Sequence, residues 1–211
     1  MQYILSPRGR RLRRLSAAPG LLCLALAASA PAHAESTYGY SAVGTGVVTA
    51  TARVNLSVTV PKLILLKVGS SGGTIDTLSW TTGFSIPATP TTPSVTANNA
   101  PVTWNGTAPT VSTSADPAAL AVAAWSNSTG STVNCAATAI GAGGPTLANF
   151  AVTATGTLPH PGANLGSCAA TPAIAANTLV SSNWAYALGG TPATWLAGAY
   201  SSVVTYTATS L

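Results

Sequence analysis

Apolar residues occupy every second position from Val48 to Val60, and polar residues fill the positions between them. Strict alternation places all the apolar side chains on one face, so the segment predicts a half-buried β-strand. As one strand, the fourteen residues from Val47 to Val60 would span about 46 Å, whereas typical strands span about 17–20 Å. The segment therefore either bends and serves two sheets, or its N-terminal half projects as a free extension.

The rest of the chain also favours strands over helices. Lys, Glu, Gln and Arg hardly occur after position 67, whereas Gly, Pro, Thr and Ser recur throughout. Beyond a buried strand at 63–68, we expect strands at 74–80, 93–97, 102–104, 111–114, 120–127, 132–139, 148–155, 178–188 and 201–209. The Ala-rich stretch 117–124 could instead form one or two helical turns. Many short strands separated by turn residues predict one all-β domain over residues 35–211, an antiparallel β-sandwich.

Residues 1–34 have the layout of a secretory signal peptide. Five arginines precede an apolar run from Leu21 to Ala30, and Ala32-His33-Ala34 is a small-residue cleavage motif. The apolar run is short for a permanent membrane helix, so an N-terminal anchor is the less favoured alternative. We expect an exported protein, located in the periplasm, at the cell surface or outside the cell, with no transmembrane segment.

Export would place Cys135 and Cys168, which lie 33 positions apart, in an oxidising compartment. An even pair of cysteines in an oxidising compartment predicts one disulfide. A redox pair or a metal site is the alternative, but neither cysteine has a CxxC partner and His160 is the only histidine after residue 34. We expect neither a metal nor a cofactor.

Charge is scarce outside the leader and excludes several function classes. The net charge of +5 comes from the five leader arginines, because Arg53, Lys62 and Lys67 balance three acidic residues, Glu35, Asp76 and Asp116. No basic patch remains to neutralise phosphates, so nucleic acid is not an expected partner. A Ser–His–Asp set could be assembled only on paper from His160, Asp76 and a serine, and no local signature supports it. We therefore expect a protein that is not an enzyme.

Tryptophans are the one feature that could signal a ligand. Exposed aromatic rings stack on sugars, and aromatic side chains also supply the bulk of a sandwich core. With so few Phe, Ile and Met residues, a core role is favoured, and a glycan platform is the alternative. The five residues are Trp80, Trp104, Trp125, Trp184 and Trp195.

The C-terminal stretch 198–209 (GAYSSVVTYTAT) runs from a G-x-Y turn into an alternating V-x-Y-T-A strand. It resembles the closing strand of secreted bacterial pilin-like β-sandwich subunits, including the spore coat protein U-like group. The resemblance is specific over about a dozen residues. It implies an immunoglobulin/pilin-like fold and a structural role in a surface fibre, pilus or extracellular matrix, with a periplasmic chaperone and an outer-membrane usher as candidate partners.

Low charge fits the same role, because a chain with little electrostatic repulsion tolerates close association with its own copies. A free alternating strand could add to the edge of another subunit's sheet and so build a homo-oligomer or fibre. Residues 35–52 form the candidate N-terminal donor strand. The expected inserted face consists of Val48, Ala50, Ala52, Val54 and Leu56. The alternative is a secreted carbohydrate-binding or adhesion module that uses surface tryptophans.

Overall fold

The computed structural model describes residues 35–211, so the predicted signal peptide lies outside the described residues. The described chain falls into two units, residues 35–59 and residues 60–211, and each is treated by itself. Residues 35–59 contain no assigned strand. They fold back locally, because the Thr37 hydroxyl donates to the Thr51 carbonyl and accepts from the Thr51 N–H, both at 2.9 Å.

Residues 60–211 form an all-β unit with antiparallel sheets, and the described chain contains no α-helix. Two short 3₁₀ turns, Leu147–Asn149 and Pro192–Thr194, are the remaining regular elements. The strands are β1 (Ile64–Val68), β2 (Thr82–Ser85), β3 (Thr110–Thr113), β4 (Leu120–Ser126), β5 (Thr132–Ala137), β6 (Phe150–Gly156), β7 (Val180–Leu188) and β8 (Val204–Thr209).

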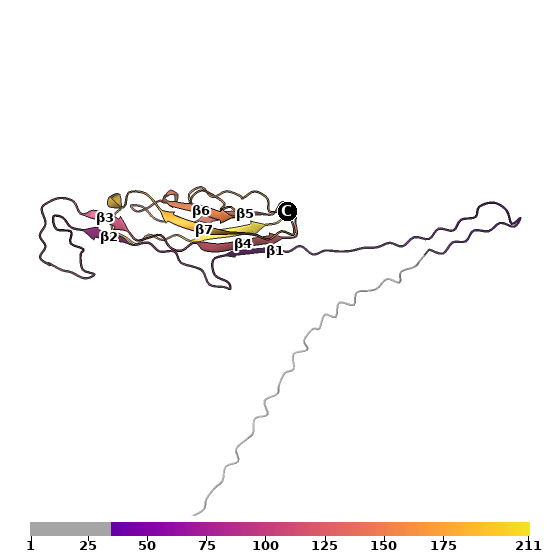
Figure 1. The fold of residues 1–211 in the computed structure, drawn as a ribbon, viewed down its shortest axis with the longest axis horizontal. Coiled ribbons are helices and arrows are strands. Elements are labelled where there is room, and N and C mark those ends of the chain that lie inside the picture. Colours follow the sequence, from indigo (N-terminus) through magenta and orange to yellow (C-terminus); the bar gives the residue numbers. More distant parts are fainter. Residues whose placement is uncertain (1–34) are drawn as a thin grey trace, which may run out of the picture. The chain divides into compact units, whose positions relative to one another are not determined.

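The strands make three sheets. The largest has the order β1-β4-β7-β6, and β2-β3 and β5-β8 are two-stranded (Figure 1). In the largest sheet the chain order and the spatial order differ, so β4 and β7, distant in sequence, lie at its centre. The β2–β3 hairpin lies at the opposite end of this unit from the C-terminus (Figure 1).

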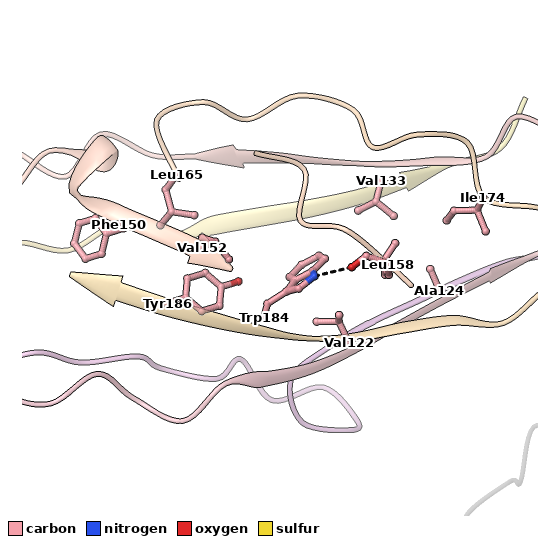
Figure 2. Close-up of a cluster of buried hydrophobic side chains, with 10 residues drawn as sticks. All are labelled: Val122, Ala124, Val133, Phe150, Val152, Leu158, Leu165, Ile174, Trp184 and Tyr186. Atoms are coloured by element: carbon pink, nitrogen blue, oxygen red, sulfur yellow. Dashed lines mark hydrogen bonds between the residues drawn. The ribbon is translucent and has the colours of Figure 1, made fainter. Parts of the chain in front are cut away.

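One core joins the four-stranded sheet to the β5–β8 pair. Trp184 on β7 is completely buried at its centre, and its indole N–H donates to the Leu158 carbonyl at 3.1 Å (Figure 2). The bond satisfies the one polar atom of the ring, so the ring can fill the core without an unpaired donor. The other members are Val122, Ala124, Val133, Phe150, Val152, Leu158, Leu165, Ile174 and Tyr186.

A segment with alternating apolar residues forms a strand in this structure only where another strand pairs with it. Seven segments predicted as strands overlap with β1 and β3–β8, to within one residue at the start of β3 and at the end of β6, whereas no segment predicts β2. The helical alternative for 117–124 is wrong, because β4 begins at Leu120 and alternates its side chains into the core. Residues 47–60 form no strand despite the clearest alternation, and neither do 74–80, 93–97 or 102–104.

The predicted disulfide between Cys135 and Cys168 is confirmed, with Cα atoms 5.3 Å apart. Cys135 lies on β5, and Cys168 lies in the long connection between β6 and β7. The bond therefore ties that connection to the edge of β5 that faces away from β8, where Thr171 N–H also donates to the Val133 carbonyl at 2.8 Å.

Replacing both Cys135 and Cys168 with Ala should lower the free energy of unfolding by about 3–4 kcal/mol, because the unfolded chain gains the freedom of a 33-residue loop. Urea unfolding of the variant and of the oxidised wild type measures this difference. The wild type under reducing conditions is the matched control and should behave like the variant. Equal midpoints for oxidised and reduced protein would contradict a stabilising disulfide.

Candidate functional site

Two strand edges of the 60–211 unit are covered by irregular segments. Residues 163–165 cover the outer edge of β6, where Val152 N–H donates to the Ala163 carbonyl and Leu165 N–H to the Phe150 carbonyl. Residues 171–174 cover β5, since Ile174 N–H donates to the Ser131 carbonyl at 2.7 Å. Around the core this leaves β1 and β8, each of which pairs with a single neighbouring strand in the part of the chain that the structure describes.

Strand β8 carries its unpaired backbone groups at alternate residues. Thr138 N–H donates to the Val203 carbonyl at 3.0 Å, which fixes the phase of the β5–β8 ladder. Because antiparallel hydrogen bonds alternate along a strand, Thr205, Thr207 and Thr209 bond to β5. The N–H and C=O groups of the alternate residues Val204, Tyr206 and Ala208 point to the open edge instead. Their side chains face the core and are half-buried.

Strand β1 also has unpaired backbone groups at alternate residues along its open edge. Gly69 N–H donates to the Ala121 carbonyl at 2.9 Å, so the ladder phase directs the backbone groups of Ile64, Leu66 and Val68 away from β4. These three side chains are half-buried, while Leu65 is 54% exposed on the other face. Each open edge therefore offers unpaired backbone groups and an apolar side chain at every second residue.

The chain enters β1 in a fixed direction. The Asn127 side chain accepts from Leu63 N–H at 2.8 Å and donates to the Pro61 carbonyl at 2.7 Å. Lys62 Nζ donates to the Leu211 carbonyl at 2.5 Å. These bonds keep residues 61–63 extended in line with β1, at the end of the unit where β8 also finishes.

The residues predicted as a donor strand are exposed to solvent. The fractions exposed are 51% for Val48, 68% for Val54 and 90% for Leu56, and Ala50 and Ala52 are exposed as well. Within 35–59 every side chain except that of Ser41 is exposed. An apolar face of this length in water costs free energy that a pairing partner would recover.

Tyr206 joins the open edge of β8 to the buried core. Its hydroxyl lies 2.7 Å from that of Tyr186 and 2.9 Å from His160 Nε2, and its ring centroid is 5.0 Å from that of Trp184. His160 Nδ1–H donates to the Gly162 carbonyl at 2.6 Å, so neutral Nε2 accepts from Tyr206, which in turn accepts from Tyr186.

Burial lowers the pKa of His160, although the bond to Gly162 opposes this, and burial raises the pKa values of Tyr186 and Tyr206. Pro159 and Pro161 flank His160, a pattern typical of a stiff, exposed loop. Instead, its ring packs edge-on against Trp184 at 4.8 Å. Alternation along 201–209 predicts that Tyr206 faces inward, but nothing in the sequence points to His160, 46 positions away, as its partner.

The five tryptophans have different surroundings. Trp184 is buried, Trp80 packs on the core with its ring 5.5 Å from Phe150, and Trp125 and Trp195 are half-buried. Trp104 alone among them is exposed, at 58%. A glycan platform that uses one or more tryptophans therefore stays a prediction, and Trp104 is the one of the five with most of its surface in solvent.

The aspartates Asp76 and Asp116 form hydrogen bonds in separate parts of the fold. Asp76 accepts from the Ser70 N–H and from the Ser70 hydroxyl, and these bonds lower its pKa. Asp116 accepts from Trp80 Nε1 at 2.8 Å and from Leu188 N–H at 3.1 Å. No hydrogen bond links Asp76, Asp116 and His160 to one another in the described part of the chain, nor do three His, Cys, Asp or Glu side chains gather there as metal ligands.

Acidification should destabilise the 60–211 unit through His160. Its folded-state pKa lies below the unfolded value of about 6.5, so the unfolded chain binds more protons below that pH. The free energy of unfolding should be level above about pH 7 and fall with decreasing pH below about 6.5, by at most about 1.4 kcal/mol per unit. Tyr186 and Tyr206 face the ring and stay neutral in this range.

Urea unfolding between pH 5 and 7.5 measures this slope. His160→Gln should be less stable than the wild type but nearly independent of pH between 6.5 and 5.5, above the range in which free carboxylates titrate. If the variant keeps the slope of the wild type, the titration belongs to other groups.

Residues 35–211 include no helix that is both long and apolar enough to cross a membrane. No family model, no curated protein and no solved structure matches this chain.

Proposed function

We propose that this protein is an exported, non-enzymatic structural subunit that self-associates by β-strand addition. One observation carries the proposal: an exposed alternating segment precedes a unit in which two strands beside the core, β1 and β8, have backbone groups without a hydrogen-bond partner among residues 35–211. Backbone hydrogen bonds would supply affinity and the alternate side chains would set the register. The candidate donor strand, residues 35–52, continues into the alternating stretch that ends at Val60, and Val48, Ala50, Ala52, Val54 and Leu56 lie on the inserted face.

The spacing of the two partners matches. A strand that pairs with β8 meets inward side chains at Val204, Tyr206 and Ala208, every second residue. Residues 48–60 present apolar side chains with the same period and polar ones between them. Any in-phase register therefore buries an apolar face, whereas a slip by one residue would bury Arg53, Asn55 and Ser57 instead.

Pairing with another copy is favoured over a hairpin within one chain. A tight hairpin onto β1 would place Pro61 and Lys62 in a two-residue turn, and the favoured turns of that length need positive φ at their first position. Proline is fixed near φ −65° and cannot adopt it. The Asn127 side chain further bonds to Leu63 N–H and to the Pro61 carbonyl, and a tight turn at Pro61 and Lys62 would have to break these bonds.

The proposal also covers the type of sandwich, the export of the protein and its assembly partners. We infer an immunoglobulin/pilin-like sandwich, in which the β1-β4-β7-β6 sheet and the β5–β8 pair are the two layers around Trp184. The leader supports export, and the resemblance of residues 198–209 to pilin-like and spore coat protein U-like subunits supports a fibre, pilus or matrix. A periplasmic chaperone and an outer-membrane usher are proposed partners, since an open edge needs protection before assembly.

Leu56→Glu tests the inserted face. A carboxylate on that face would have to be buried in the neighbouring subunit, so self-association should weaken at least tenfold. Ser57→Glu is the matched control, since it adds the same charge to the opposite face and should assemble like the wild type. Sedimentation and light scattering measure assembly, and both variants should melt with the wild type because both positions are exposed. A monomeric wild type, or equal behaviour of the two variants, would refute strand addition through this face.

Ala208→Pro tests the accepting edge. The Ala208 N–H points away from β5, so proline removes a donor that the subunit itself does not use and blocks an incoming strand. Assembly should be lost while the melting temperature changes by only a few degrees. Thr207→Pro is the contrasting variant, because it breaks a bond to β5 and should cost at least about 1 kcal/mol of stability. Normal assembly of stable Ala208→Pro would exclude β8 as the acceptor.

A further inference from the structure

An arm, residues 81–114, extends from the β1–β4 connection and contains β2 and β3. Its base is closed by Ser114 N–H, which donates to the Thr81 carbonyl at 2.8 Å. The arm contains both exposed aromatic rings of the 60–211 unit, Phe84 at 52% and Trp104 at 58% exposed. No charged residue or histidine occurs between Asp76 and Asp116.

The arm holds Trp104 in place although it leaves the ring in solvent. The indole N–H donates to the Thr107 carbonyl at 2.6 Å, and Trp104 bridges to Ala88 across the arm. The Asn105 side chain accepts from Thr107 N–H at 3.1 Å and so fixes the turn that presents the acceptor. Because the polar atom of the indole is already bonded, the exposed part of the ring is its apolar surface.

The surroundings of the ring restrict the chemistry of an occupant. An arm without ionisable side chains offers no ion pair to a charged partner. The polar side chains beside the Trp104 ring are those of Asn105 and Thr107, and amide and hydroxyl groups of this kind can bond to the hydroxyl groups of a ligand. An apolar ring face bordered by such groups matches a pyranose, which has C–H groups on its face and hydroxyls at its rim. We propose that Trp104 is the stacking platform of a binding site for neutral polysaccharide.

The site is independent of the proposed assembly surface. The β2–β3 hairpin lies at the end of the unit opposite the C-terminus (Figure 1), while Lys62 bonds to Leu211 where the chain enters β1. A strand added along β1 or β8 would use backbone groups outside the arm. Glycan binding by Trp104 therefore adds an adhesive function to the structural one, and either can fail without the other.

Affinity electrophoresis tests the site with purified protein in gels that contain amylose, galactomannan, laminarin or hydroxyethyl cellulose, with anionic alginate as the charge control. At least one neutral polysaccharide should slow the wild type. Trp104→Ala should weaken that binding at least tenfold, and Trp104→Phe should retain most of it because a ring face remains. Trp125→Phe is the matched control outside the arm and should bind like the wild type.

The proposal is overturned if no neutral polysaccharide slows the wild type, if alginate alone does so, or if Trp104→Ala binds as well as the wild type. Sedimentation of Trp104→Ala distinguishes a glycan-binding role of Trp104 from a contact between copies of the protein. Lost self-association with unchanged polysaccharide binding would make Trp104 a contact between copies and would also refute the site. Loss of Leu56-dependent assembly leaves the electrophoresis unaffected, so the two functions are tested separately.

Discussion

Backbone hydrogen bonding at strand edges is the constraint on which the rest of this structure depends. A strand leaves half of its N–H and C=O groups unpaired wherever it lacks a second neighbour. Here irregular segments supply that neighbour for β6 and β5, through Ala163 and Leu165 in one case and through Thr171 and Ile174 in the other. The long connection between β6 and β7 thus serves as edge cover, and the disulfide holds part of it there. Among residues 35–211, no segment forms such hydrogen bonds with the open edges of β1 and β8, and we propose these edges as the place for an added strand.

Trp184 is the largest fully buried side chain of the core, and several parts of the fold meet at its ring. Large aliphatic residues are scarce, and alanine, valine and small polar residues occupy many inward positions. Trp184 supplies volume that several smaller side chains would otherwise provide, and it bonds to Leu158 in the connection that covers the edges. The same ring contacts His160 and Tyr206, so the core, the edge cover and β8 meet around it. The histidine is therefore held neutral by the packing that orders the fold.

The sequence predicted those features that depend on local pattern. Alternation and turn residues located β4 through β8, and two cysteines in an exported chain were enough for the disulfide. The strand predicted at residues 47–60 is not formed. An alternating pattern shows which face a strand would bury, but it does not show whether a second strand is available to pair with it. The strand predicted at 74–80 is not formed either, and there Leu78 and Trp80 pack on the core without a ladder. The contact between His160 and Tyr206 joins distant segments, and no local signal encodes such a contact.

Tyr206 limits what could pair with β8. Its side chain belongs to the core, while its backbone groups point to the open edge. Because its hydroxyl is engaged by both Tyr186 and His160, the ring cannot turn outward to adapt to an incoming strand without breaking those bonds. An occupant must therefore fit a fixed surface, with apolar side chains at every second residue and little bulk opposite the ring. Residues 48–60 satisfy both requirements, since small Ala50 and Ala52 alternate in phase with the larger Val54 and Leu56. In the proposed strand addition, packing would then select the register that places an alanine opposite Tyr206.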